Sequence, residues 1–178
     1  MARILFVVAP EDFRDEELFE PKAELEHAGH TCVIASRRVG TCTGLRGRRT
    51  VAKVALADAD ANDYAAVVFV GGPGARTYFD DSAALSLARD AFEADKVVGA
   101  ICIAPTILAS AGLLADKRAT AFYTEARAVR AGGAHYEGPS VVVDGKLITA
   151  TGPDQALAFG KALVRALGAP VTREARPG

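Results

Sequence analysis

Short apolar segments alternate with amphipathic segments along most of this chain. The apolar segments lack the polar–apolar alternation of half-buried strands, which is typical of strands covered on both faces of a parallel sheet. They are Arg3–Ala9, Thr31–Ser36, Ala65–Val70 and Lys96–Ile101. Apolar residues at helical spacing predict helices over Glu16–Ala28, Ser82–Ala94, Pro105–Leu114 and Pro153–Leu167. The order of these elements predicts an α/β fold, with a mostly parallel sheet and helices on both faces.

Three further segments add strands to this outline. Gly40–Val54 is rich in Gly and Thr and alternates weakly, which predicts a small hairpin. Val141–Ile148 predicts a second hairpin, because an Asp-Gly pair supplies the positive-φ turn between two β-branched runs. Ala119–Tyr123 is a candidate for one more short strand. We expect a single domain over residues 1–167, followed by a flexible C-terminal tail over 168–178.

Composition removes several classes of function from consideration. The formal net charge is −1 and the sequence pI is about 6.3, so there is no electrostatic reason to expect nucleic acid or a membrane surface as a partner. The N-terminal residues do not have the pattern of a signal peptide. Cys32, Cys42 and Cys102 form no Cys-x-x-Cys pair, so we expect no disulfide framework, metal site or cofactor. A cytoplasmic protein is the expectation.

Three turns are expected to meet at one edge of the sheet. In open parallel sheets, ligand-binding and active sites lie beyond the carboxyl ends of the strands. The turns that lie there are residues 10–17, Gly71–Gly74 and the turn at Cys102.

Cys102 has two interpretations, and its neighbours leave both open. The stretch around it reads GAICIAP, with the small residues Ala100 and Ala104 two positions before and after the cysteine. A nucleophile elbow needs small residues at these positions, and Pro105 suits the first turn of the following helix. The start of that helix would favour the thiolate form of Cys102. The alternative is a small buried thiol at a strand end.

The other two turns are similarly ambiguous on their own. The backbone N–H groups of Gly71 and Gly72, together with that of Ile103, can form an oxyanion hole, but two glycines also make an ordinary tight turn. Three acids in a row, Asp15-Glu16-Glu17, suit a catalytic role or simply the start of a helix. The residues alone do not choose among the three.

The motifs taken together resemble the ThiJ/PfpI family. This family is a branch of the class I glutamine amidotransferase-like superfamily that includes the Parkinson-disease-associated protein and proteins reported as deglycases and glyoxalase III enzymes. The resemblance spans Arg3 to about Leu167. Four stretches carry it: ILFVVAPEDFRDEELFEP, AAVVFVGGPGA, GAICIAPTILASAGLL and VVVDGKLITATGP. It implies a flavodoxin-like three-layer sandwich with a cysteine nucleophile elbow.

Residue by residue, the resemblance assigns a site. It implies that Cys102 is the elbow cysteine and that Glu17 is the glutamate that hydrogen-bonds it, with Gly72 and Ile103 as backbone donors around the sulfur. A protonated Glu17 would stabilise a thiolate or a sulfinate through a charge-assisted hydrogen bond. The resemblance also implies a homodimer.

Histidine is missing at three positions where branches of the family have it. Ile103 follows the elbow cysteine in place of histidine, and neither Ala119–Tyr123 nor the stretch before the last helix contains one. His27 and His30 bracket the end of the first helix and are expected at the surface. His135 is the remaining candidate for the site.

Three functions follow from these residues. The first is a cytoplasmic stress-response protein with glyoxalase III or deglycase-like activity on α-oxoaldehydes such as methylglyoxal, with Cys102 as nucleophile and Glu17 as acid and base. The second is a non-enzymatic redox sensor or chaperone that responds to peroxide through oxidation of Cys102. The third is an amide hydrolase or peptidase, which the missing histidine disfavours.

Overall fold

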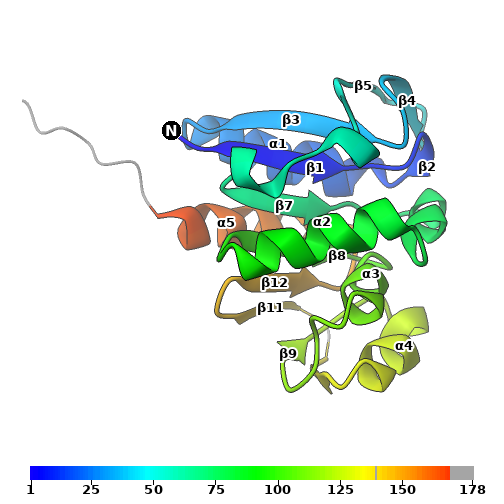
Figure 1. The fold of residues 1–178 in the computed structure, drawn as a ribbon, viewed down its shortest axis with the longest axis vertical. Coiled ribbons are helices and arrows are strands. Elements are labelled where there is room, and N and C mark those ends of the chain that lie inside the picture. The colour runs from blue at the N-terminus through cyan, green and yellow to red at the C-terminus, as the bar shows by residue number, and fades with distance from the viewer. Residues whose placement is uncertain (139, 169–178) are drawn as a thin grey trace, which may run out of the picture.

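A seven-stranded sheet forms the centre of the computed structural model, which describes residues 1–138 and 140–168 (Figure 1). The strand order is β11-β12-β8-β7-β1-β3-β6, and every neighbouring pair is parallel except β11 with β12. The strands are β1 (Arg3–Val7), β3 (Thr31–Ser36), β6 (Val54–Ala55), β7 (Ala66–Phe69), β8 (Val97–Ile101), β11 (Val141–Asp144) and β12 (Leu147–Ala150). The predicted α/β fold is confirmed.

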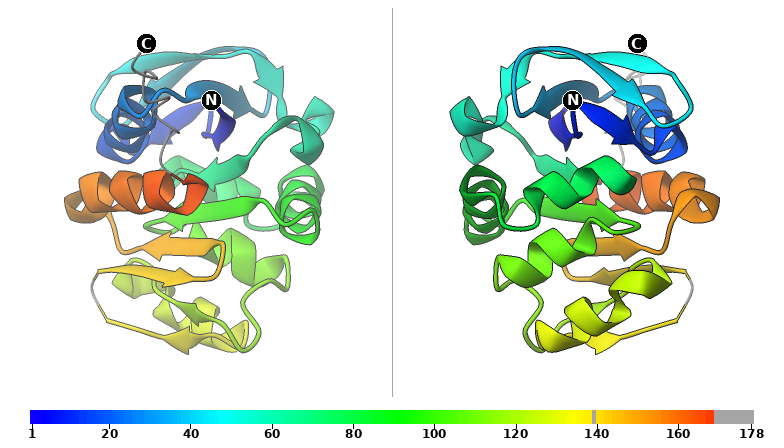
Figure 2. Two further views of the ribbon diagram at one scale, coloured as in Figure 1. Left: turned by 90° about the vertical axis from the view of Figure 1, so that its left-hand side faces the viewer. Right: turned by 90° about the vertical axis from the view of Figure 1, so that its right-hand side faces the viewer.

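Helices cover both faces of this sheet, giving three layers (Figure 2). The α-helices are α1 (Asp15–His27), α2 (Ser82–Glu93), α3 (Pro105–Ser110), α4 (Ala126–Ala131) and α5 (Ala156–Leu167). Helices α1 and α5 pack together on one face, and α2 and α3 lie on the other. Apolar side chains alternate along β1, so that Ile4 and Phe6 enter the core under α1 and α5, while Leu5 and Val7 enter the opposite core.

Small elements complete the chain. The strands β2 (Glu11–Phe13), β4 (Gly40–Gly44) and β5 (Arg49–Ala52) form a three-stranded sheet, and β9 (Arg118–Ala119) pairs with β10 (His135–Tyr136). The 3-10 helices are η1 (Leu56–Asp58), η2 (Ala61–Asp63), η3 (Pro73–Tyr78), η4 (Tyr123–Glu125) and η5 (Pro153–Gln155). Both predicted hairpins are confirmed, as β4–β5 and β11–β12. Within the described residues, no helix has the length and apolar character to cross a membrane.

Some predicted boundaries are wrong for local reasons. The helix expected over Pro105–Leu114 ends at Ser110, because Gly112 adopts a φ of +79° that an α-helix does not allow. The strand expected over Ala119–Tyr123 pairs only through its first residue. The helix expected from Pro153 begins as the 3-10 turn η5. Of the expected tail, residues 169–178 lie outside the described part of the chain.

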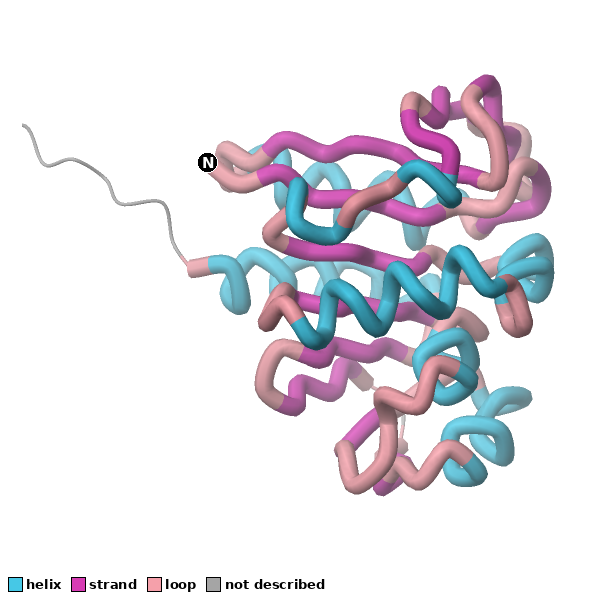
Figure 3. The backbone as a smooth tube through the Cα atoms, viewed as in Figure 1, coloured by secondary structure: helices cyan, strands magenta, loops and turns pink. Residues whose placement is uncertain are grey.

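The carboxyl ends of β1, β7 and β8 face the same edge of the sheet. In Figure 3 the loops that follow these strands gather on the right-hand side of the molecule. One backbone hydrogen bond joins two of the loops, because Arg14 N–H donates to the Gly71 carbonyl at 3.0 Å. The predicted meeting of three turns is therefore present, and residues far apart in sequence become neighbours there.

Candidate active site

Cys102 lies at a sharp turn between β8 and α3. Its φ is +66°, a left-handed conformation that is uncommon for residues other than glycine. Two backbone hydrogen bonds hold the turn: Cys102 N–H donates to the Ala150 carbonyl at 2.9 Å, and Phe122 N–H donates to the Cys102 carbonyl at 2.7 Å. Ala100 and Ala104 are completely buried, so larger side chains have no room there. This is the geometry of a nucleophile elbow, in which the backbone turns sharply and presents its side chain beyond the sheet.

Glu17 lies beside Cys102 and is completely buried. Its Oε2 accepts a hydrogen bond of 3.0 Å from Gly71 N–H, while its Oε1 has no hydrogen-bond partner among the described residues. A side chain at Gly71 would prevent this approach, since a Cβ there would lie 2.5 Å from Glu17 Oε2 and 2.6 Å from Cys102 Cβ. Gly71 therefore allows the carboxyl and the sulfur to meet.

The three acids at the start of α1 have three different environments. Asp15 is buried and accepts hydrogen bonds from the backbone N–H groups of Arg46 at 2.8 Å and Arg48 at 3.0 Å. Glu16 is half-buried and forms ion pairs with Arg14 and Arg46. Glu17 alone of the three lines the pocket at Cys102. The structure thus separates residues that the sequence alone left equivalent.

Burial sets the protonation of the Glu17–Cys102 pair. Loss of solvent raises the pKa of Glu17 to about 8, although hydrogen bonds with Cys102 and Gly71 act in the opposite direction. Loss of solvent also raises the pKa of the Cys102 thiol, to about 12, and a charged Glu17 adds to the rise. Two groups in such close contact titrate as a unit. At neutral pH we therefore expect Glu17 to keep a proton.

This result corrects the expectation of a thiol that favours its thiolate form. Backbone hydrogen bonds from Gly72 and Ile103 act to lower the pKa of Cys102. Their effect is smaller than that of burial and of the neighbouring carboxylate. While Glu17 is protonated the carboxylate charge is absent, and its O–H can then donate to a thiolate.

A pocket of about 280 Å³ opens onto the sulfur. Besides Cys102, Glu17, Gly72 and Ile103, it is lined by Arg14, Leu45, Pro73, Arg76, Phe122, Thr124 and Pro153. A second pocket, of about 370 Å³, adjoins it and shares Phe122 and Pro153. The site is therefore small and lined largely by apolar side chains, with two arginines among them.

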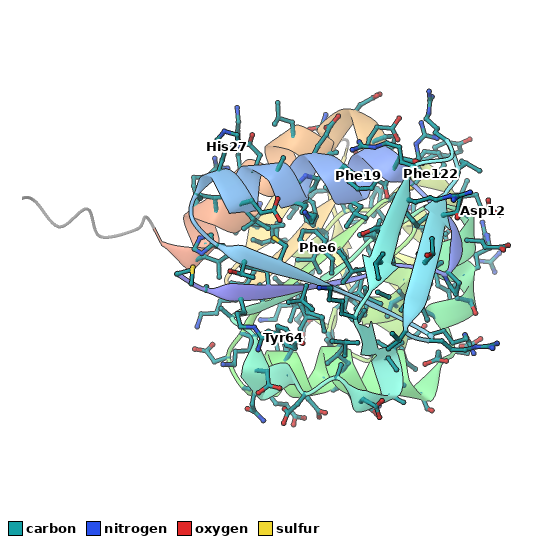
Figure 4. The ribbon with its side chains drawn as sticks, turned by 90° about the horizontal axis from the view of Figure 1, so that it is seen from above. Phe6, Asp12, Phe19, His27, Tyr64 and Phe122 are labelled. Atoms are coloured by element: carbon teal, nitrogen blue, oxygen red, sulfur yellow. The ribbon has the colours of Figure 1, made fainter. Side chains whose placement is uncertain are left out.

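The histidines lie away from this pocket. His135 is exposed on β10, where it lies opposite Arg118 of the neighbouring strand β9. No histidine of the described residues lines the pocket. His27 is exposed at the C-terminal end of α1, far from Asp12, which lies just before the N-terminal end of that helix (Figure 4). His30 was expected at the surface, but it is only 9% exposed, and the N–H of Ala2, just before β1, donates to its Nδ1 at 3.2 Å.

Some lining residues could not be found from the sequence pattern. Arg14 belongs to one of the three predicted turns and Arg76 follows another by two residues, but nothing in the pattern shows that their side chains border the pocket. Phe122 reaches the pocket through its backbone hydrogen bond to Cys102, a contact between chain segments that has no local signal.

No group of three or more His, Cys, Asp or Glu residues in the described chain is arranged to hold a metal ion. The chemistry available at the site is that of a thiol, a carboxyl group that can exchange a proton, and two N–H donors directed at the sulfur. Such an arrangement suits a covalent adduct at sulfur followed by local proton transfer.

Comparison with known proteins identifies the family of this chain. The family model described as the DJ-1/PfpI family matches residues 2–166. The chain belongs to the DJ-1/PfpI family.

Several relatives in this family match nearly the whole chain. Uncharacterized protein MJ0967 of Methanocaldococcus jannaschii is 41% identical over 93% of this chain and 82% of its own length. Deglycase PH1704 of Pyrococcus horikoshii is 31% identical over 93% of this chain and 99% of its own. Glutathione-independent glyoxalase DJR-1.2 of Caenorhabditis elegans is 28% identical over 93% of this chain and 89% of its own.

A solved structure of the DJ-1/PfpI family has the same fold. The ThiJ/PfpI domain protein of Brachyspira murdochii is 34% identical and superposes with a TM-score of 0.92, covering 94% of this chain and 97% of the other. The flavodoxin-like three-layer arrangement that the sequence resemblance implied is therefore confirmed.

Proposed function

We propose that this protein is a glyoxalase or deglycase-like enzyme that acts on α-oxoaldehydes such as methylglyoxal, with Cys102 as nucleophile and Glu17 as acid and base. The observation that carries the proposal is the position of the buried Glu17 carboxyl beside Cys102, with both side chains packed against Gly71 and Glu17 Oε1 left without a hydrogen-bond partner among the described residues. The names of two relatives, a deglycase and a glyoxalase, support it.

The first step forms a bond between the Cys102 sulfur and the aldehyde carbon. The π electron pair of the carbonyl moves to its oxygen, and that oxygen takes the proton lost by the thiol, with Glu17 as the carrier. The product is a hemithioacetal. In this step the N–H groups of Gly72 and Ile103, which interact with the sulfur, donate to the new oxygen.

The second step moves a hydrogen between two carbons. Glu17 first releases its proton to solvent; the ionised carboxylate then removes the proton from the former aldehyde carbon, the electron pair forms a carbon–carbon double bond, and the ketone oxygen takes a proton from solvent. Glu17 then returns its proton to the second carbon while the hydroxyl group on the sulfur-bearing carbon loses its proton to solvent, which gives a thioester of lactate. Water then hydrolyses the thioester, so that methylglyoxal and one water give lactate and the free thiol.

The test is to follow lactate formation by the purified protein incubated with methylglyoxal. We expect lactate from the wild type and from a Cys42→Ala control, whose thiol is buried in β4. We expect no lactate above background from Cys102→Ala, with circular dichroism confirming that the variant is folded. Equal rates for Cys102→Ala and the wild type would refute the assignment of the nucleophile.

A second candidate function is a peroxide sensor. It is favoured by the same unpartnered Oε1 of Glu17, because a protonated carboxyl beside the sulfur can donate to an oxygen added there. Each peroxide adds one oxygen to the sulfur and leaves as water. Intact-mass measurement with peptide mapping during a peroxide titration tests this function, and oxidation of Cys32 or Cys42 before Cys102 would contradict it.

An amide hydrolase is not favoured, since no described histidine lines the pocket to protonate a leaving amine. A cytoplasmic location remains a prediction from the sequence, and a role in stress response and a homodimer remain predictions from the family resemblance.

A further inference from the structure

We propose that the pocket at Cys102 selects carbonyl compounds that carry an anionic group, a carboxylate or a phosphate, and that Arg14 and Arg76 bind that group. This inference rests on the proposed function for the identity of the reacting group, but the anion preference itself can be measured without turnover. The two guanidinium groups that line the pocket indicate the substrate class, carbonyl compounds with a negative charge.

Arg76 brings a positive charge that nothing in the described structure neutralises. It lies exposed on η3, at the mouth of the pocket, and its side chain has neither an ion pair nor a hydrogen-bond acceptor among the described residues. Its guanidinium carbon lies 5.8 Å from the centre of the Phe79 ring. A guanidinium presents five N–H donors in a plane, a geometry that suits carboxylate and phosphate oxygens.

Arg14 adds a second cation that is only partly neutralised. Its Nε donates to Glu16 at 2.8 Å, but Glu16 also pairs with Arg46 at 3.1 Å. One carboxylate thus serves two guanidinium groups, and the four remaining N–H groups of Arg14 have no acceptor among the described residues.

The other acidic groups near the sulfur do not cancel this charge. Glu17 keeps its proton at neutral pH because it is buried. Asp154 follows Pro153 in the chain but lines the neighbouring pocket. The pocket at Cys102 therefore has a net positive lining, which raises the local concentration of anions in a confined space.

The two arginines are held on adjacent turns. Arg14 N–H donates to the Gly71 carbonyl, and a Cβ at Gly72 would lie 2.4 Å from Arg14 N, so the two backbones are in contact. Gly72 in turn accepts a hydrogen bond from Ala75 N–H, next to Arg76. The lining also includes the apolar side chains of Ile103 and Phe122. A substrate that places its carbonyl at the sulfur and its anionic group at the arginines fits a pocket lined by both apolar and cationic side chains.

Alkylation of Cys102 tests the preference directly. Iodoacetate and iodoacetamide are close in size and differ in charge; with either, sulfur forms a bond to the CH₂ carbon, iodide leaves and the thiol proton passes to solvent. The measured quantity is the ratio of the iodoacetate to the iodoacetamide rate at Cys102, by peptide mass spectrometry, divided by the same ratio for the urea-unfolded chain. Changes in thiol pKa affect both reagents alike and cancel in the ratio.

We expect this normalised ratio to exceed one in the wild type, by about tenfold at low salt. It should fall severalfold in Arg76→Gln and in Arg14→Gln. The matched control is Arg165→Gln, which removes the same charge from α5 beside the pocket that His27 lines, and it should keep the wild-type ratio. A wild-type ratio at or below one, or an equal fall in Arg165→Gln, would overturn the proposal.

A substrate pair extends the test to turnover. Dioxovalerate is an α-oxoaldehyde with a carboxylate tail, and its methyl ester has the same chain without the charge. We expect a higher kcat/KM for the acid, mainly through KM, and loss of that preference in Arg76→Gln. Inorganic phosphate and acetate, tested as protectants of Cys102 against iodoacetamide, separate phosphate esters from carboxylates. If methylglyoxal is not converted but the alkylation ratio is high, the proposed function fails while the anion site stands.

Discussion

At the scale of single residues, the site depends on where one proton lies. Glu17 and Cys102 are both buried, burial raises the pKa of each, and a charged Glu17 raises the pKa of Cys102 further. The sequence pattern identified the small residues around Cys102, but Glu17 was distinguished from Asp15 and Glu16 only by the family resemblance. Glu17 differs from the other two acids in its burial and in its contact with Cys102, 85 positions further along the chain. The local sequence pattern shows neither property.

The raised pKa of Glu17 predicts how stability depends on pH. An unfolded chain loses this proton near the ordinary value of 4.5, whereas the folded protein keeps it until about pH 8. Between these values the folded state binds more protons, so this group's contribution to stability is full below pH 4.5 and is lost as pH rises through 8. We expect the free energy of unfolding of the wild type to fall relative to that of Glu17→Gln, by up to about 1.4 kcal/mol per pH unit.

Urea denaturation at a series of pH values between 5 and 9 measures this difference. The matched control is Glu20→Gln, an exposed glutamate on the same helix, which should give a curve parallel to the wild type. Parallel curves for Glu17→Gln and the wild type would show that Glu17 is ionised in the folded protein.

At the scale of elements, long apolar segments were predictable and short ones were not. The buried strands and the helices α1, α2 and α5 have enough residues for the pattern of their apolar positions to be recognised. The short strands β2 and β10 and the six-residue helix α4 do not, so they were missed, and the strand predicted over Ala119–Tyr123 shares only Ala119 with β9. These short elements form where the chain wraps around the ends of the sheet, and long-range hydrogen bonds specify them.

Close packing of α1 against α5 gives a second prediction. A Cβ at Gly160 would lie 2.8 Å from the Pro21 backbone and 3.2 Å from the Glu24 side chain. Glycine to alanine in a helix ordinarily stabilises by about 1 kcal/mol. We expect Gly160→Ala instead to destabilise the protein, by about 1–3 kcal/mol, because the helices must move apart. Thermal or urea unfolding measures the change, and a gain in stability would show that the interface can relax.

At the scale of the whole molecule, the parallel sheet explains why distant residues share one site. Strand ends that are far apart in sequence meet at one edge, so Glu17, Gly72 and Cys102 become neighbours. This much follows from topology and was predictable. The charge of the pocket was not, because the overall net charge of −1 conceals a local cationic lining.

The family resemblance also predicts a homodimer. Light scattering coupled to size-exclusion chromatography should give about twice the chain mass of 18.5 kDa, independent of concentration in the micromolar range. A mass equal to one chain would contradict that prediction and would leave the site described above as the property of a single chain.

The most direct test of the central claim is a double-mutant cycle on lactate formation from methylglyoxal, with wild type, Cys102→Ala, Glu17→Gln and the double variant. Residues that act as one unit have non-additive effects on rate. We therefore predict that both single variants fall to nearly the same low rate and that the double variant is no slower. Independent, multiplying losses in the double variant would contradict a mechanism in which the Cys102 sulfur and the Glu17 carboxyl act together.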